Sequence, residues 1–354
     1  MNVLTAPDSE THEQVRNYYG RELTSSDDLK TSACCTEDAI PAHHKHILSL
    51  IADEVLGRFY GCGSPIPPVL VDCTVLDLGC GTGRDVYLAS ALVGEKGKVI
   101  GVDMTEEQLA VAVRYEEEHT DKFGYSVPNT SFRLGMIEDL SSAGIDDESV
   151  DVVISNCVIN LSPDKEAVFR EIFRVLKLGG ELYFSDVFSD RRLTKDMKTD
   201  PVLRGECLGG ALYDEDFRRL LFNLGCPDYR VVSQHAITMK DPALKTKLGS
   251  TGFTSKTIRA FKLDSLEDRC EDFGQVANYK GGIEGSDHAF LFDDHHLFQK
   301  GRPMLVCGNS ASMIEETRYG AYFDVVGDRS THYGLFDGCI KDSASETAGI
   351  GNCC

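Results

Sequence analysis

A glycine-rich turn at residues 79–83 is the part of the chain best suited to hold a cofactor. It follows an apolar stretch that contains Asp77. Glycines at 79, 81 and 83 allow the backbone to bend sharply and to approach a ligand where a Cβ would intrude. About twenty residues later, a second apolar stretch ends in Asp103, where a carboxylate can accept hydrogen bonds from both hydroxyls of a ribose. These residues therefore predict an adenosine-containing cofactor.

The glycine spacing and the charge of Asp77 distinguish between possible cofactors. A dinucleotide turn has the spacing G-x-G-x-x-G and directs a helix N-terminus at a pyrophosphate, whereas this chain has G-x-G-x-G. Asp77 would repel a pyrophosphate but attract a cationic amino-acid group. S-adenosylmethionine carries an ammonium and a sulfonium and no phosphate, so the turn favours this cofactor. A nicotinamide cofactor, which would indicate an oxidoreductase, and a turn without a ligand are the weaker alternatives.

Cysteines occupy several settings in which a thiolate could act on a substrate. Cys157 follows a predicted strand at the edge where the methyl group of the cofactor should point, and Cys207 lies in a glycine-bounded segment. Cys62 stands between two glycines, and Cys34 forms a vicinal pair with Cys35. Packing explains any one of these cysteines best, but beside a methyl donor they indicate together a thiophilic substrate bound by thiolates. We expect other cysteines to be small buried hydrophobic residues, namely Cys73, Cys80, Cys226, Cys270 and Cys307.

Four segments of the chain match a known enzyme family. They are residues 28–31 ahead of the first cysteine, residues 60–63, residues 155–161 and residues 205–212. In these segments the chain resembles the arsenite S-adenosylmethionine methyltransferases, and the similarity covers most of its length. The last two segments are the most specific, because an ordinary methyltransferase has no reason to carry cysteine there. The resemblance implies methyl transfer from S-adenosylmethionine to trivalent arsenic, a reaction that detoxifies arsenic.

The resemblance also implies roles for single residues. The four active cysteines fall on Cys34, Cys62, Cys157 and Cys207. We expect Cys62, Cys157 and Cys207 to bind arsenic(III), and the family suggests a disulfide between Cys34 and Cys62 that returns two electrons after methylation. Glutathione or thioredoxin would then reduce this disulfide. Asn156, at the end of the fourth strand, is expected near the transferred methyl group. The other residues of the implied cofactor pocket are Tyr60, Asp77, Gly79, Gly81, Arg84, Asp103, Met104, Ile137 and Glu138.

Strands and helices alternate around these residues. Thr105 and Gln108 predict a capping box at the start of the second helix, and Gly179 and Gly180 are expected to end the third. The alternation predicts an α/β fold, a doubly wound Rossmann-like methyltransferase sheet of parallel strands with ligands at their carboxyl ends. The predicted strands are 75–78, 99–102, 131–134, 150–155, 181–186, 229–233 and 235–239, and the predicted helices are 85–93, 105–119, 164–176 and 214–224.

Four segments are expected along the chain, since a substrate domain and a C-terminal region are added to the sheet. They are an N-terminal segment with Cys34 and Cys62 (1–72), an S-adenosylmethionine-binding methyltransferase domain (73–187), an arsenic-binding substrate domain (188–283) and a C-terminal region with a cysteine-containing tail (284–354).

The composition restricts the partners of the chain. It has 354 residues and a formal net charge of −21, so nucleic acid would meet a like-charged surface. No apolar run approaches about 18 residues, and the first residues lack the pattern of a signal peptide. We expect a soluble cytoplasmic monomer that does not bind nucleic acid or membranes. Two other functions remain open, a methyltransferase acting on oxygen, nitrogen or carbon, and a thiol-rich protein that sequesters metalloids.

Overall fold

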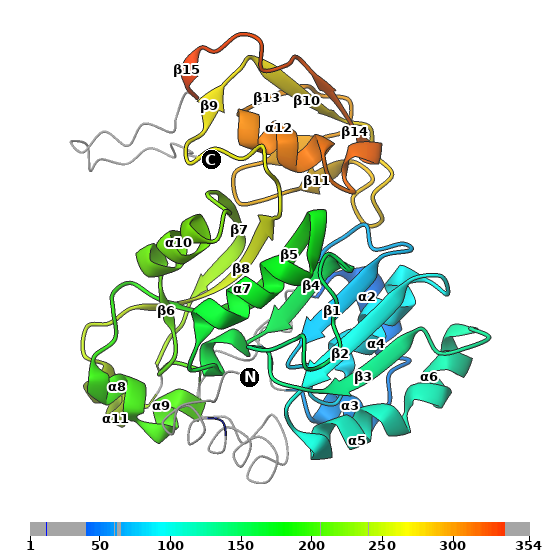
Figure 1. Cartoon of the computed structure of the whole chain (residues 1–354), viewed down its shortest axis with the longest axis vertical. Helices are drawn as coiled ribbons and strands as arrows, with labels where there is room; N and C mark the ends of the chain where they lie inside the picture. Colours follow the sequence, from blue (N-terminus) through cyan, green and yellow to red (C-terminus); the bar gives the residue numbers. More distant parts are fainter. Residues whose placement is uncertain are drawn as a thin grey trace.

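An eight-stranded mixed sheet forms the centre of the protein (Figure 1). The computed structural model describes residues 12, 40–59, 61, 65–205, 207–239 and 241–336. The order of strands in the sheet is β3-β2-β1-β4-β5-β8-β7, and β6 pairs with the end of β5. The strands are β1 (Thr74–Leu78), β2 (Lys98–Asp103), β3 (Thr130–Leu134), β4 (Val150–Asn156), β5 (Leu176–Ser189), β6 (Leu212–Tyr213), β7 (Tyr229–Ala236) and β8 (Phe253–Phe261).

The sheet is parallel only in part, which corrects the expectation of a parallel sheet. Strands β1 to β5 pair in parallel, as the alternation of strands and helices predicts. Strand β8, which the sequence patterns did not identify, runs antiparallel to both β5 and β7. Doubly wound sheets commonly carry antiparallel strands at one edge, because such strands need no helical crossover. The two strands expected at 229–239 form the single strand β7, which a register shift between Val231 and Ser233 interrupts.

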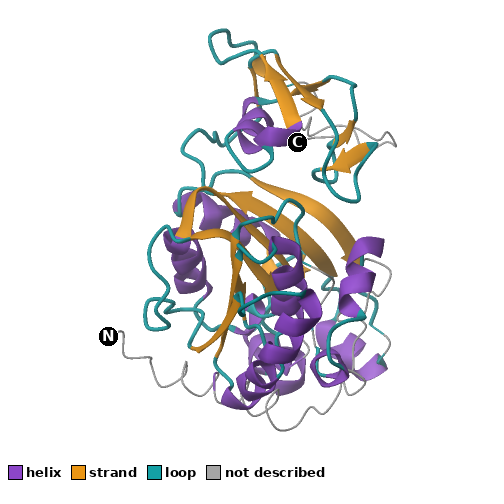
Figure 2. Ribbon diagram, turned by 90° about the vertical axis from the view of Figure 1, so that its right-hand side faces the viewer, coloured by secondary structure: helices purple, strands orange, loops and turns teal. Residues whose placement is uncertain are grey.

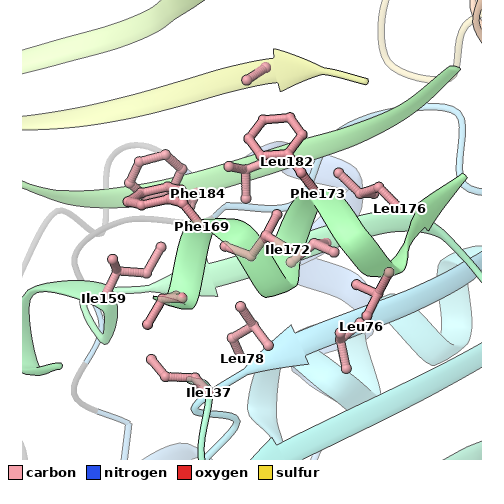
Figure 3. Packing of buried hydrophobic residues seen from close by; sticks show 14 of the residues in the cluster. Leu76, Leu78, Ile137, Ile159, Phe169, Ile172, Phe173, Leu176, Leu182 and Phe184 are labelled. Atoms are coloured by element: carbon pink, nitrogen blue, oxygen red, sulfur yellow. The ribbon is translucent and has the colours of Figure 1, made fainter. Parts of the chain in front are cut away.

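Helices cover both faces of the sheet, as Figure 2 shows from the side. On one face, Val75 and Val152 pack with residues of α4 such as Val86. On the other face, Leu76 belongs to one apolar cluster with residues of α7 such as Ile172 (Figure 3). Neighbouring residues of a strand point to opposite faces, so β1 contributes to both cores. The helices around the sheet are α2 (Ala42–Leu48), α3 (Asp53–Gly57), α4 (Arg84–Val93), α5 (Glu106–Arg114), α6 (Glu116–Phe123), α7 (Lys165–Val175) and α10 (Asp214–Asn223).

Two local predictions about helix ends are wrong. Thr105 precedes α5, but its side chain makes no capping hydrogen bond, and its amide instead donates to Asp103 Oδ1 (2.8 Å). The glycines at 179 and 180 do not end α7. That helix stops at Val175, and both glycines lie inside β5, where the Gly179 amide donates to the Lys262 carbonyl (2.8 Å). Pairing with neighbouring chain segments, which the local sequence does not show, overrides the helix-stop signal.

The segment 188–283 joins the sheet through β6, β7 and β8. It also supplies three short helices, α8 (Lys195–Thr199), α9 (Pro201–Gly205) and α11 (Pro242–Leu248). Residues from α9, α11 and β8, among them Leu203, Leu244 and Phe253, pack in one apolar cluster with Cys157 and Cys207. This segment therefore covers the carboxyl end of β4.

A C-terminal module lies at the opposite, amino end of the parallel strands (Figure 1). Its described strands pair antiparallel in three small sheets, and the module encloses an aromatic core that includes Phe290, Phe298 and Tyr319. No helix in the described part of the chain is long and apolar enough to cross a membrane. The elements of the module are β9 (Glu271–Asp272), β10 (Gln275–Tyr279), β11 (Ala289–Leu291), β12 (Leu297–Gln299), β13 (Met304–Val306), α12 (Gly308–Glu315), η6 (Gly320–Tyr322), β14 (Phe323–Val326) and β15 (Gly334–Leu335).

A buried ion-pair network joins this module to the central sheet. Glu181 of β5 accepts a hydrogen bond from Arg259 Nε (2.8 Å) and another from the guanidinium of Arg318. The Tyr319 hydroxyl donates to the same carboxylate (3.1 Å). The Glu181 side chain is fully buried, so the two arginines supply the charge that it needs in the protein interior.

Candidate active site

One cavity opens at the carboxyl ends of β1, β2 and β4, next to the glycine turn. Most residues that the sequence assigned to the cofactor line it, and Tyr60 lies outside the described residues. Residues that the sequence analysis did not identify also line it, among them His12, Asp85 and Ser162. The predicted residues around the cavity are Asp77, Gly79, Gly81, Arg84, Asp103, Met104, Ile137, Glu138 and Asn156.

The glycine turn has the backbone geometry that its sequence predicts. Gly79, Gly81 and Gly83 all have positive φ, at 69°, 54° and 88°. A Cβ on Gly79 would come within 2.4 Å of the Val158 side chain, so the turn closes against the segment after β4. The Asp103 carboxylate holds the turn in place, because its Oδ2 accepts a hydrogen bond from the Gly81 amide (2.9 Å).

Buried carboxylates make the cavity suitable for a cation. Burial raises the pKa of Asp77 well above its ordinary value, and the charges of Asp85 and Asp103 raise it further. Arg84 opposes this effect and contacts Asp85, with 3.2 Å between Nη1 and Oδ1. A ligand with positive groups would favour the ionised form of Asp77, whereas a pyrophosphate would be repelled. The cavity therefore fits S-adenosylmethionine, as the sequence predicts, better than a dinucleotide.

Glu138 is held by two residues from distant parts of the chain. Its Oε1 lies 3.0 Å from His12 Nε2 and also accepts a hydrogen bond from the Ser162 hydroxyl. Burial favours the protonated form, but these hydrogen bonds outweigh it and lower the pKa of Glu138. The sequence analysis did not identify His12, because no local pattern marks it. Only the fold brings His12 next to Glu138, which lies 126 residues away in the sequence.

Cys157 and Cys207 meet at the edge of this cavity. The Cys207 thiol donates to the carbonyl oxygen of Cys157 (Sγ–O 3.3 Å), although 50 residues separate them in sequence. The side chains are buried, with 3% and 1% exposed, and Cys157 lines the cofactor cavity. Both cysteines have left-handed backbone, with φ of 57° and 59°. Left-handed backbone is uncommon in non-glycine residues and often occurs at active sites.

The oxidation states of the described cysteines differ. Cys157 is disulfide-bonded, so it can act as a thiolate only after reduction. Cys207 is in the thiol form, and so are the cysteines expected to pack in the interior, which are indeed buried, namely Cys73, Cys80, Cys226, Cys270 and Cys307. The two remaining active cysteines expected from the sequence, Cys34 and Cys62, and the pairing expected between them lie outside the described residues.

Close backbone packing positions the segment that follows Cys207. A Cβ on Gly210 would lie 1.8 Å from the Asn160 carbonyl oxygen, so only glycine fits there. Asn160 belongs to the short helix η5 (Ile159–Leu161), which follows Cys157. Asp186 of β5 fixes this helix by accepting hydrogen bonds from the Asn160 amide (3.0 Å) and side chain (2.6 Å). Gly210, Asn160 and Asp186 therefore set the relative position of the two cysteines.

Comparison with known proteins identifies the family. A methyltransferase-domain family matches residues 70–225, and the arsenite methyltransferase C-terminal domain matches residues 274–348. The arsenite methyltransferase of Aquipseudomonas alcaligenes is 53% identical to this chain, over 93% of the chain and 94% of its own length. The chain belongs to the arsenite methyltransferase family. The human arsenite methyltransferase is 43% identical, over 89% of this chain and 84% of its own.

A solved structure of the family has the same fold. The arsenic(III) S-adenosylmethionine methyltransferase from Chlamydomonas reinhardtii superimposes with a TM-score of 0.82 and is 50% identical. The match covers 84% of this chain and 100% of that structure. The family resemblance and the Rossmann-like methyltransferase fold predicted from the sequence are thereby confirmed.

Proposed function

We propose that this arsenite methyltransferase transfers methyl groups from S-adenosylmethionine to trivalent arsenic held by Cys157 and Cys207, with Cys62 as the third ligand. The contact between the Cys207 thiol and the Cys157 backbone, at the edge of the cofactor cavity, carries this proposal. An ordinary methyltransferase needs no pair of strained, buried cysteines beside its methyl donor, and packing alone gives no reason for their left-handed backbone.

The cavity residues would hold the cofactor through complementary charges and hydrogen bonds. Each oxygen of the Asp103 carboxylate accepts a backbone hydrogen bond, from Gly81 and from Thr105. A carboxylate oxygen has two lone pairs, so both oxygens can also accept a ribose hydroxyl. Asp77 would attract the ammonium group. The bound sulfonium is an activated methyl donor, so no residue need act as a general base on the substrate.

Arsenic(III) fits a site of cysteine ligands. It is a soft ion, binds three sulfur ligands in a pyramid, and keeps a lone pair at the apex. The task of Cys157 and Cys207 is to direct this lone pair at the methyl carbon, in line with the departing sulfur. Free cysteine titrates at about 8.5, so near neutral pH the ligands start as thiols, and each thiol gives its proton to a hydroxide of arsenite that leaves as water.

A thiol reductant completes the proposed reaction. Methyl transfer formally raises arsenic to the pentavalent state, and two electrons must return before another methyl group is added. Formation of one disulfide supplies two electrons, and we propose Cys34 and Cys62 for this step. Glutathione or thioredoxin would then restore the two thiols. We propose that the chain acts as a monomer on arsenite or its thiol conjugates.

The direct test is to incubate the purified protein with arsenite, glutathione and S-adenosylmethionine and then to separate the arsenic species. We expect methylated arsenicals in step with consumption of the methyl donor. Arsenite binding without consumption of the donor would instead indicate a sequestering protein. Methyl transfer to oxygen, nitrogen or carbon acceptors alone would indicate an ordinary methyltransferase.

Replacement of Gly210 by alanine should separate catalysis from cofactor binding. The added Cβ would lie 1.8 Å from the Asn160 oxygen, so the segment carrying Cys207 must move. A displacement of about 1 Å can lower a rate by about a hundredfold, and we expect a loss of this size in arsenite methylation. S-adenosylmethionine affinity, measured by calorimetry, should stay within about twofold because Gly210 does not line the cofactor cavity.

Gly57→Ala is the matched control for this substitution. Gly57 has no atom within 4 Å of the position that its Cβ would occupy, so the variant should retain its activity. Equal activity of the two alanine variants would show that the Gly210 contact does not position Cys207.

Replacement of Asp103 by asparagine should weaken cofactor binding. It removes the negative charge that accepts hydrogen bonds in the turn and, we propose, from the ribose. Hydrogen bonds to a charged group contribute about 1.5–3 kcal/mol, so the dissociation constant should rise by about 10- to 100-fold. Calorimetric titration with S-adenosylmethionine measures the change. Glu107→Gln, on the exposed side of α5, serves as control. If the Asp103 variant bound S-adenosylmethionine as tightly as this control, Asp103 would not bind the ribose.

A further inference from the structure

A second cavity lies beside the first and has a different character. Leu161 and Ser162 line both cavities, so the two adjoin at the short helix after Cys157. The second cavity extends between the start of α7, the helices α8 and α9, and the glycines that follow Cys207. Its location next to the proposed acceptor site makes any ligand that it binds a neighbour of the Cys207 segment.

Basic side chains outnumber acidic ones in this second cavity. Among the described residues that line it, four are basic and Asp216 is the only acid. This excess of positive charge is local, because the whole chain has a formal net charge of −21. The four basic residues are Lys165, Arg192, Lys198 and Arg204.

Two of these basic residues have no carboxylate partner in the described structure. Arg192 is neutralised by Asp216, with two hydrogen bonds of 2.6 Å. Among the described residues, Lys165 Nζ donates only to backbone carbonyls, of Ser162 (3.0 Å) and Asn160 (3.3 Å). Lys198 is exposed and, within the ranges that the structure describes, forms no ion pair. The charges of Lys165 and Lys198 are therefore available to a ligand.

The electrostatics of Lys165 show that the cations are crowded. Burial lowers the pKa of Lys165 to about 8, and repulsion by Lys198 and Arg204 contributes to this decrease. Asp186 and Glu138 act in the opposite direction but do not compensate. A bound anion would relieve this repulsion and favour the charged form of the lysine.

We propose that this second cavity binds a small molecule with more than one carboxylate or phosphate group, and that Lys165 and Lys198 are its main cationic contacts. The guanidinium of Arg204, which donates to the Lys198 carbonyl (2.9 Å), fixes the backbone that carries Lys198. In a strongly acidic protein, a local cluster of this kind attracts anions that the remaining surface repels. The site goes beyond the proposed methyl transfer and needs neither arsenic nor S-adenosylmethionine for its binding.

Calorimetric titration of the full chain with citrate and, separately, with inorganic pyrophosphate tests the proposal at constant ionic strength. We expect saturable binding of at least one probe, and the tighter probe identifies a carboxylate or a phosphate ligand. The double variant Lys165→Gln, Lys198→Gln should bind this probe at least about tenfold more weakly. Lys195→Gln is the matched control, since Lys195 lies on α8 beside Lys198 but does not line the cavity, and it should bind within about twofold.

Each possible result either supports the proposed anion site or overturns it. Loss of probe affinity in the double variant but not in the control supports the site. The site is overturned if the double variant and the control both keep the affinity for the probe or both lose it equally. It is also overturned if neither probe binds saturably to the parent protein. S-adenosylmethionine titration of the double variant, and its circular dichroism spectrum, show whether the protein is folded when probe binding is lost. Because no arsenic is present, failure of this site is distinguishable from failure of the proposed methylation.

Discussion

Replacing Cys207 with serine is expected to abolish arsenite methylation while leaving S-adenosylmethionine affinity within about twofold. Serine nearly preserves the volume of the side chain, but its hydroxyl is a hard ligand that binds trivalent arsenic poorly. Loss of a partner that only supports a ligand typically costs about 10- to 100-fold, so loss of the ligand itself should cost at least about 100-fold. Cofactor affinity should survive because Cys207 does not line the cofactor cavity.

Cys226→Ser is the control for this experiment. Cys226 also carries a reduced thiol with 1% exposed surface, but its sulfur donates to the carbonyls of Asp228 (3.3 Å) and Phe261 (3.7 Å), away from the site. Separation of arsenic species after incubation gives the two rates. If Cys207→Ser methylated arsenite as fast as Cys226→Ser, Cys207 would not be an arsenic ligand.

Replacing Glu181 with glutamine should strongly destabilise the fold without replacing a residue of the candidate active site. The substitution removes the carboxylate that is paired with Arg259 and Arg318 in the interior. Two buried guanidinium groups would then lack a counterion, and breaking a buried ion pair in this way costs about 3–5 kcal/mol. Chemical denaturation followed by circular dichroism should show this decrease in the free energy of unfolding.

Glu166→Gln provides the comparison for the buried pair. Glu166 pairs with Arg170 on the surface of α7, where both side chains are more than half exposed. Exposed pairs contribute about 0–1 kcal/mol, so this variant should remain close to the parent protein. A Glu181 variant as stable as the Glu166 variant would show that the network does not secure the C-terminal module.

The local parts of the fold and of the site could be predicted because their signals lie within a few residues. The glycine turn needs positive φ at Gly79, Gly81 and Gly83, and glycine adopts it without strain. The strands from β1 to β5 appear in the sequence as apolar runs between helical segments, and their parallel pairing follows from that alternation. Asp77 and Asp103 end up at one cavity because the carboxyl ends of neighbouring parallel strands lie at one edge of the sheet.

Predictions failed where pairing between distant segments decides the structure. Gly179 and Gly180 look like a helix end, but contacts with the chain beyond β8 draw them into β5. Strand β8 carries Arg259, which is only 1% exposed, and a buried charge obscures the alternation of apolar and polar residues. Arg259 can be buried only because Glu181, 78 residues away in the sequence, supplies the opposite charge.

By itself, the sequence determined the family, the cofactor turn and the cysteines that are candidates for arsenic binding. Each of these depends on residue types and short spacings. Only the tertiary structure decided that Cys207 contacts Cys157 and that His12 reaches Glu138. It also gathered the basic residues around Lys165 into one cavity of an acidic protein. The reason is that contacts between residues far apart in the chain depend on how whole layers pack, and no local pattern records that packing.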